Sequence, residues 1–221
     1  MDDPFVRPPK LNGLPPEGEK SSRDGSRAAD HRVILVTGPK HSGKTTLVET
    51  AIAPLAGQGV RIAGILARGL WLDGLRVGFD LINLDSGHCT PLARRRTGHH
   101  PEHRMMFDFF DAGFLAGAEA LSLDVCRAAD VVVVDEIGRL EARGDGWAPH
   151  LRQLLTLEGS LLILVARLDC MPLIRERFGL YDVPLIDVRD PGALDRLRAA
   201  LGGLKSSRCG EAASRRRTQG P

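Results

Sequence analysis

The chain has 221 residues, of which 43% are hydrophobic and 26% charged, and its formal net charge is +2. This length and apolar content suffice for one sizeable α/β domain and leave little for a second. The positive charge is concentrated in residues 203–221 and the middle of the chain is mildly acidic, which argues against a specific nucleic-acid-binding surface on the domain. No apolar run approaches the length of a membrane span.

The two ends of the chain differ in composition from the middle. Residues 1–31 are rich in proline, glycine, serine and charge without periodicity, and residues 203–221 are similar but basic. We therefore predict two disordered tails around one domain at residues 32–202. The acidic start lacks the apolar run of a secretory signal, and the four cysteines form no C-x-x-C pair. These features predict a cytoplasmic protein with reduced thiols rather than a disulfide framework or a zinc site.

Between the tails, apolar runs with strand character alternate with stretches of helical spacing. This alternation is typical of an α/β fold in three layers, with a mostly parallel sheet covered by helices. A turn around Asp73-Gly74 between two strand-like runs breaks the alternation and predicts a β-hairpin insertion. The predicted strands are 33–37, 60–67, 76–82, 131–134, 161–165 and 184–188, and the predicted helices are 47–55, 114–129, 147–157, 173–178 and 191–201.

The segment after the first predicted strand matches the G-x-x-x-x-G-K-S/T phosphate-binding loop, or P-loop. Its two glycines let successive backbone N–H groups turn inward toward phosphate oxygens, and the helix that follows adds its positive N-terminal end. Lys44 is expected to reach the β- and γ-phosphates of a nucleoside triphosphate such as ATP or GTP, and the Thr45 hydroxyl to ligate Mg²⁺. The residues predicted to bind the nucleotide are Gly38, Pro39, Lys40, His41, Ser42, Gly43, Lys44, Thr45 and Thr46.

The second part of the predicted site follows four consecutive valines, which form a buried strand ending in Asp135-Glu136. The strand delivers both acids to the carboxyl edge of the sheet, where a phosphate-loop enzyme needs them. Asp135 is expected to hold Mg²⁺ together with Thr45, directly or through water, and Glu136 to orient and deprotonate the attacking water. Lys44 and Glu136 are thus the predicted catalytic residues. A solvated turn acid is the alternative, and the phosphate loop argues against it.

Asp135 to Gly138 also fits the D-x-x-G element of signalling GTPases, whose glycine senses the γ-phosphate. Such proteins read guanine with an N-K-x-D element after a later strand. The nearest candidate, Ala166 to Asp169, lacks both the asparagine and the lysine. A guanine-specific switch is therefore disfavoured.

Taken together, the motifs resemble one family of small nucleoside triphosphatases, which includes the thermophilic nucleotide phosphatases and the cancer-related nucleoside triphosphatase. The resemblance covers residues 33–201 and rests on 38–46, on 64–84 with Arg76-Val77-Gly78-Phe79 at its centre, on 134–141, and more weakly on Arg189-Asp190. It implies slow, broad-specificity, Mg²⁺-dependent hydrolysis of nucleoside triphosphates to diphosphates. Residues 94–110 depart from the family pattern, with Phe107 or Phe109 where a tyrosine-containing strand often lies.

Several arginines are candidates for phosphate contacts. The run at 94–96, with Arg104 nearby, could serve as a lid element, although a solvated basic loop is the favoured interpretation. Arg139, Arg143 and Arg189 are candidates for an arginine that stabilises the transition state. For these three, surface salt bridges are favoured.

Neither the histidine cluster at 99–103 nor the apolar cluster at 105–110 is predicted to be a functional site. His99, His100 and His103 lack the second well-spaced ligand pair that a metal site requires. The methionines and phenylalanines at 105–110 are expected to belong to the core rather than to contact a cofactor.

Two rival functions remain open. A P-loop small-molecule or nucleotide kinase would use the same loop to transfer the γ-phosphoryl group to an acceptor, with residues 94–104 as its candidate lid. A nucleotide-dependent switch or accessory protein would use slow hydrolysis to reset a partner interaction, and nothing in the chain names such a partner. Hydrolysis is favoured because Glu136 is placed to activate water.

Overall fold

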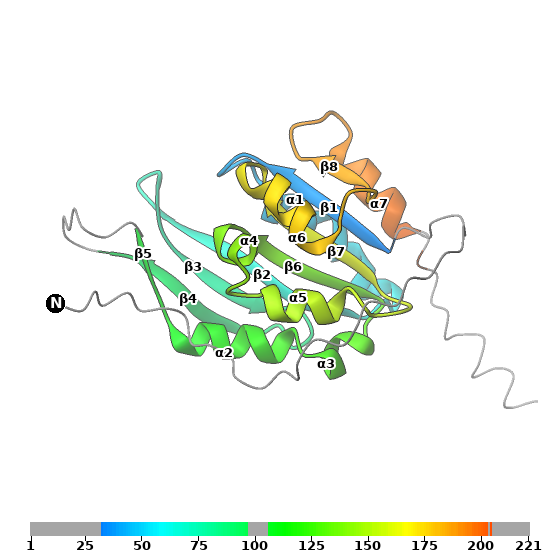
Figure 1. Ribbon diagram of the computed structural model, residues 1–221, viewed down its shortest axis with the longest axis horizontal. Helices are drawn as coiled ribbons and strands as arrows, with labels where there is room; N and C mark the ends of the chain where they lie inside the picture. The colour runs from blue at the N-terminus through cyan, green and yellow to red at the C-terminus, as the bar shows by residue number, and fades with distance from the viewer. Residues whose placement is uncertain (1–31, 97–105, 203, 205–221) are drawn as a thin grey trace, which may run out of the picture.

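The computed structural model describes residues 32–96, 106–202 and 204, which form an eight-stranded sheet between two layers of helices (Figure 1). The predicted tails at 1–31 and 203–221, apart from Leu204, lie outside the described residues, as do the predictions for Arg104 and the histidines at 99–103. The domain boundaries at 32 and 202 therefore stay predictions.

The strand order in the sheet is β5-β4-β3-β2-β6-β7-β1-β8. The five neighbouring strands β2, β6, β7, β1 and β8 run parallel to one another. Strands β3, β4 and β5 continue the sheet beyond β2 in antiparallel fashion. The strands are β1 Val33–Gly38, β2 Ile62–Leu72, β3 Leu75–Asn83, β4 Cys89–Arg95, β5 Phe107–Phe109, β6 Val131–Ile137, β7 Leu161–Arg167 and β8 Leu185–Asp187. The predicted α/β class and mostly parallel sheet are confirmed.

The sheet is apolar on both faces because helices cover both. In β6, Val132 and Val134 pack into one core, and Val131 and Val133 pack into the other. Alternate residues of a strand point to opposite faces, so a central strand buried on both sides must be an unbroken apolar run. Four consecutive valines meet this demand.

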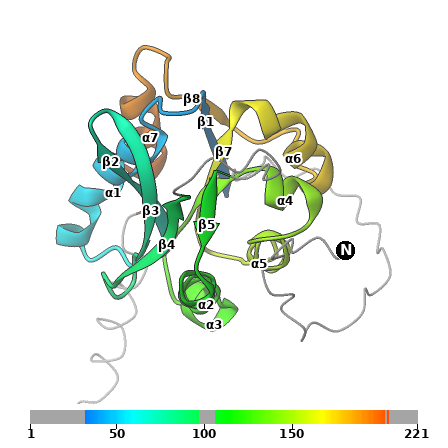
Figure 2. The same cartoon turned by 90° about the vertical axis from the view of Figure 1, so that its left-hand side faces the viewer.

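Helices α1 and α7 cover one face of the sheet, and the remaining helices lie on the other (Figure 2). The helices are α1 Lys44–Ile52, α2 Asp111–Ala120, α3 Leu123–Arg127, α4 Arg139–Arg143, α5 Ala148–Leu154, α6 Met171–Phe178 and α7 Ala193–Gly202, with short 3-10 turns η1 Ala53–Gln58 and η2 Leu168–Cys170. Within the described ranges, no helix has the length and apolar character needed to cross a membrane.

The predicted hairpin is confirmed as the antiparallel pair β2 and β3, and the turn lies at Asp73-Gly74. Strand β2 pairs with β6 only from Ile62 to Ile65. The distal half of the hairpin therefore continues past β6, on the side where the parallel strands end. This extension brings the hairpin to the phosphate loop.

Three sequence expectations were wrong in detail. The single helix predicted at 114–129 is divided into α2 and α3, because Ser122 takes an extended conformation and becomes the N-cap of α3. The arginine run is not a solvated loop: Arg94 and Arg95 lie on β4, and Arg94 pairs with Asp80 at 2.7 Å. The aromatic cluster is core only in part, since Met106 is 56% exposed.

Candidate active site

The phosphate loop runs from the end of β1 into α1, as its sequence predicts. Gly43 is the N-cap of α1 with φ 84°, and Lys44 is the first helical residue. A Cβ atom on Gly38 would lie 2.5 Å from Val188 Cγ1 and 2.6 Å from Ser42 Oγ, so only glycine fits where the loop leaves the strand. The loop therefore presents its backbone at the N-terminal end of a helix, the arrangement that binds phosphate groups.

Lys44 is held across the loop with its ammonium group inside the site. The side chain is only 6% exposed, and Nζ donates a hydrogen bond of 2.9 Å to the Pro39 carbonyl. The same nitrogen lies 3.6 Å from Glu136 Oε1. The structure thus brings together the two residues predicted to be catalytic, although they come from segments more than 90 positions apart.

Asp135 is buried at the carboxyl end of β6 and retains one unsatisfied oxygen. Its Oδ2 accepts a hydrogen bond of 3.3 Å from the Ala67 N–H, whereas Oδ1 has no hydrogen-bond partner among the described residues. Burial and then the charge of Glu136 raise the pKa of Asp135 to about 7, against the lowering effect of the Thr45 hydroxyl. A buried carboxylate oxygen without a partner, beside a hydroxyl, fits a hard cation such as Mg²⁺.

Glu136 occupies an irregular position in β6. The pairing of β6 with β7 shifts register between Asp135 and Ile137, so Glu136 has no partner in the ladder. Its side chain is 24% exposed. Of the two adjacent acids, one is therefore enclosed beside the loop, and the other remains accessible to water.

Strand β7 lies between β1 and β6, so the acids and the phosphate loop are two strands apart in the sheet. The Thr37 hydroxyl donates to the Ala166 carbonyl at 3.1 Å and ties the end of β1 to β7. Neighbouring strands are about 4.8 Å apart, which leaves roughly 10 Å between the backbones of β1 and β6. The side chains of Lys44 and Glu136 span this separation and meet at the carboxyl edge of the sheet.

Glu141 fixes the turn that follows Glu136. It is only 4% exposed, and its two oxygens accept hydrogen bonds from the N–H groups of Gly138 at 2.8 Å and Trp147 at 3.0 Å. Sequence reasoning gave Glu141 no role beyond its place in the fingerprint. Glu141 thus supplies one half of a capping box to Gly138, the N-cap of α4. Gly138 has no side chain to supply the other half, so the usual S/T-x-x-E signal is absent from the sequence.

Arg76 of β3 is a second residue whose place near the site sequence reasoning missed. Its guanidinium carbon lies 5.0 Å from the centroid of the Trp71 ring and 4.6 Å from that of Phe79. Burial lowers the pKa of Arg76, while the negative charges of Glu136 and Asp135 oppose the shift. Arg76 is therefore a partly buried cation whose charge interacts with those of both acids.

Comparison with known proteins agrees with this geometry. The family model described as NTPase matches residues 33–189, which is most of the chain. The chain belongs to the NTPase family. The match includes every strand from β1 to β8, and with them the phosphate loop and the two acids at the end of β6.

Curated relatives within the NTPase family match at moderate identity. The cancer-related nucleoside-triphosphatase of Homo sapiens is 33% identical over 140 residues, which cover 60% of this chain and 73% of the human protein. The nucleoside-triphosphatase THEP1 of Thermococcus kodakarensis is 32% identical over 139 residues, covering 61% and 76%.

Two solved structures of similar proteins have the same fold. The solution structure of the human cancer-related nucleoside triphosphatase matches with a TM-score of 0.58 at 29% identity, covering 80% of this chain and 99% of that one. The crystal structure of THEP1 from Aquifex aeolicus, at 22% identity and a TM-score of 0.56, covers 76% and 98% and supports the fold alone. The P-loop NTPase fold predicted from the sequence is confirmed.

The arginines singled out in the sequence lie apart from this NTPase site or are already paired. Arg139 is 3.7 Å from Asp169, and Arg189 is 2.6 Å from Asp187, the salt-bridge role that the sequence favoured. Arg143 is exposed.

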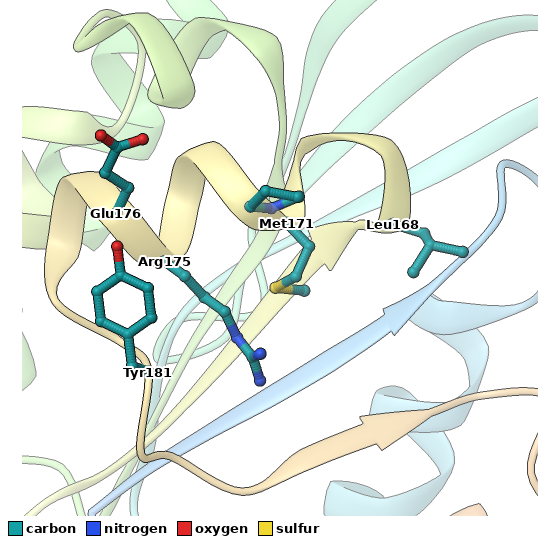
Figure 3. Close-up of a pocket in the computed structure, with 6 residues that line it drawn as sticks. Leu168, Met171, Arg175, Glu176 and Tyr181 are labelled. Atoms are coloured by element: carbon teal, nitrogen blue, oxygen red, sulfur yellow. The ribbon is translucent and has the colours of Figure 1, made fainter.

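A separate hollow of about 580 Å³ lies against α6 (Figure 3). Its lining is formed by Leu168, Met171, Pro172, Arg175, Glu176 and Tyr181. None of the residues predicted to bind phosphate or Mg²⁺ contributes to it, so this hollow is not part of the active site.

Proposed function

We propose that this chain hydrolyses nucleoside 5'-triphosphates to a diphosphate and phosphate with the help of Mg²⁺, without strong preference for the base. As a member of the NTPase family, it is a nucleoside-triphosphate hydrolase. The observation that carries the residue assignment is the 3.6 Å approach of Glu136 Oε1 to Lys44 Nζ, beside the buried Asp135 Oδ1, which has no hydrogen-bond partner in the part of the chain that the structure describes.

In this mechanism the phosphate loop holds the triphosphate through its backbone N–H groups, and Lys44 exchanges its contact with Pro39 for the β- and γ-phosphates. Glu136 accepts a proton from a water molecule whose oxygen attacks the γ-phosphorus in line. The bond from the γ-phosphorus to the β–γ bridging oxygen breaks, and Lys44 offsets the charge that develops on that oxygen. The products are a nucleoside diphosphate and inorganic phosphate.

Thr45 and Asp135 would hold Mg²⁺, directly or through water. When bound, the ion would supply positive charge that offsets the negative charge of the phosphates. The burial of Asp135 suits this role, because a nearby cation favours the ionised carboxylate that burial alone disfavours.

Broad base specificity is supported by Arg167, the last residue of β7, and by Asp169 in the turn that follows. The guanidinium of Arg167 is occupied by Asp169, with hydrogen bonds of 3.0 and 2.5 Å. Neither side chain is therefore free to bind the edge of a base, and the segment also lacks the N-K-x-D element of guanine-specific proteins.

The kinase alternative draws no support from the hollow beside α6, because no predicted site residue lines it and an acceptor there would not meet the γ-phosphate. A cytoplasmic location remains a proposal that rests on the cysteine pattern.

A phosphate-release assay with ATP, GTP, CTP and UTP, with and without Mg²⁺, tests the proposal. We expect turnover of all four with Mg²⁺ and its loss in EDTA. Lys44→Ala should lower kcat/KM by about 100-fold or more, because it removes a charged donor from the transition state. Turnover in EDTA at the Mg²⁺ rate, use of a single nucleotide, or wild-type turnover by Lys44→Ala would each contradict one part of the proposal.

A further inference from the structure

We propose that Arg76 is a catalytic residue of this site, and that its guanidinium contacts the γ-phosphoryl group and stabilises the negative charge of the transition state. This inference rests on the proposed function. The sequence offered Arg139, Arg143 and Arg189 as candidates for an arginine that stabilises the transition state. The inference assigns that role to Arg76 of the β2–β3 hairpin instead.

The first observation is that the side chain of Arg76 is fixed in place. Its backbone pairs with Trp71 across the hairpin, and its guanidinium carbon lies 5.0 Å from the Trp71 ring and 4.6 Å from the Phe79 ring. A Cβ atom on Gly69 would lie 2.8 Å from Arg76 Nη2, so the absence of a side chain at Gly69 makes room for the group. Cation–π contacts hold a guanidinium plane while leaving its edge and donors free.

The second observation is that the Arg76 side chain has no hydrogen-bond or ion-pair partner among the described residues. Its guanidinium forms no salt bridge and donates no hydrogen bond within residues 32–96 and 106–202, and its Nε is buried without a partner. By contrast, Arg94 pairs with Asp80 and Arg189 with Asp187. An arginine has five N–H donors, and leaving a buried one unsatisfied is costly. An anionic ligand would satisfy these donors.

The third observation concerns the groups with which the charge of Arg76 interacts. Glu136 and Asp135 are the acids whose charges act on Arg76, raising its pKa against the larger effect of burial. The charge of Arg76 in turn helps burial to lower the pKa of His41 in the phosphate loop, and the His41 ring lies 4.9 Å from that of Trp71. Arg76 and His41 of the phosphate loop therefore contact the same Trp71 ring, and the charges of the two acids act on Arg76.

A phosphoryl group held by the loop and attacked by water from Glu136 must lie between these elements. In the transition state its three equatorial oxygens share the negative charge, and Lys44 is placed to meet the oxygens on the β–γ side. A guanidinium can contact two of the oxygens at once. An arginine supplied within the chain removes the need for a partner protein to provide it.

Arg76→Ala and Arg76→Lys in the full-length chain test this role, with Arg68→Ala as a matched control. Arg68 lies on the same hairpin, is exposed, and is occupied by Glu49. Three quantities are measured with Mg²⁺ present: kcat, the affinity for ADP, and the affinity for ADP with aluminium fluoride, which mimics the transferring phosphoryl group.

We expect Arg76→Ala to lower kcat by about 10³-fold and to lose most of the gain in affinity that aluminium fluoride gives, because arginines in this role contribute about 10³ to 10⁵ to kcat. Affinity for ADP should change by less than about threefold, since ADP lacks the γ-phosphoryl group. Arg76→Lys keeps the charge but not the two-point contact, so its kcat should remain well below that of the wild type. Free guanidinium ion added to Arg76→Ala should restore part of kcat.

Wild-type kcat in Arg76→Ala, or an unchanged response to aluminium fluoride in a folded variant, would overturn the inference. A lower melting temperature with normal kcat would show a packing role only. If Arg76→Ala does not fold, the same measurements on Arg76→Lys decide, and wild-type kcat there overturns the two-point contact. Loss of turnover in Lys44→Ala combined with normal turnover in Arg76→Ala would refute this inference and leave the proposed function standing.

Discussion

Replacing Glu136 by glutamine should change catalysis and nucleotide binding in opposite directions. The substitution removes the proposed general base and also deletes a negative charge 3.6 Å from the Lys44 ammonium. Two unit charges at that distance attract each other by about 1 kcal/mol in bulk water and by about 5 kcal/mol at an effective dielectric constant of about 20. With Lys44 6% and Glu136 24% exposed, the value lies between these limits.

A bound triphosphate must compete with Glu136 for the Lys44 ammonium group. Replacing Glu136 by neutral glutamine removes this competition, so part of the lost Lys44–Glu136 attraction becomes available to ligand binding. A gain of roughly 1 kcal/mol corresponds to about fivefold tighter binding, since 1.4 kcal/mol is a factor of ten. Loss of a general base lowers kcat by about 10²- to 10⁴-fold. The expected outcome is a kcat lower by at least about 100-fold, together with equal or tighter affinity for a non-hydrolysable triphosphate.

Phosphate release measures kcat, and isothermal titration with the non-hydrolysable analogue measures affinity. Glu49→Gln is the control, because Glu49 lies on α1, is exposed, and pairs with Arg68 rather than with Lys44. Unchanged kcat in Glu136→Gln would remove Glu136 from the catalytic role. A fall in both kcat and affinity would show that Glu136 acts by organising the loop, and the reasoning from its charge would be refuted.

Two predictions concern stability, measured by urea unfolding. In Gly64→Ala the new Cβ would lie 2.0 Å from the Val133 carbonyl oxygen at φ +100°, so we expect a loss above about 3 kcal/mol, more than the strained backbone alone costs. Gly87→Ala is the control, since Gly87 has φ +73° in open space, and equal losses in the two variants would exclude the clash as the cause. Glu141→Gln replaces one of two buried acceptors by a donor and should cost about 1 to 3 kcal/mol, because one N–H group loses its partner. Unchanged stability there would mean that water satisfies that N–H group.

The parts of the site that could be predicted from sequence are those built by local rules. The phosphate loop is a continuous segment that matches a known motif. The run of four valines predicts a buried strand, and Asp135-Glu136 directly after it predicts that the strand ends in acidic side chains. The hairpin could be predicted because Asp and Gly are residue types that tolerate positive φ, which both Asp73 and Gly74 adopt in the turn. The assignment of catalytic and metal-binding roles to these residues is a separate matter and stays a prediction.

The parts that were missed depend on contacts between distant segments. Strand β4 contains Pro91 and basic residues, so local propensity disfavours it. It pairs with β3 and β5 and buries Leu92 and Ala93, while Asp80 pairs with Arg94. The environment of Arg76 is of the same kind. Its aromatic contacts come from both strands of the hairpin, and the acids that act on it come from β6. No pattern within a window of sequence shows that these groups meet.

The contact between the phosphate loop and the hairpin also gives the protein its own optical reporter. The chain has two tryptophans, of which Trp147 is buried against α2, while Trp71 is 50% exposed with its ring against His41. Indole emission depends on exposure to water and on neighbouring charge. A nucleotide that moves His41 therefore alters the emission of Trp71 and leaves that of Trp147 as an internal reference. Occupancy of the loop becomes a change in intrinsic fluorescence that needs no label.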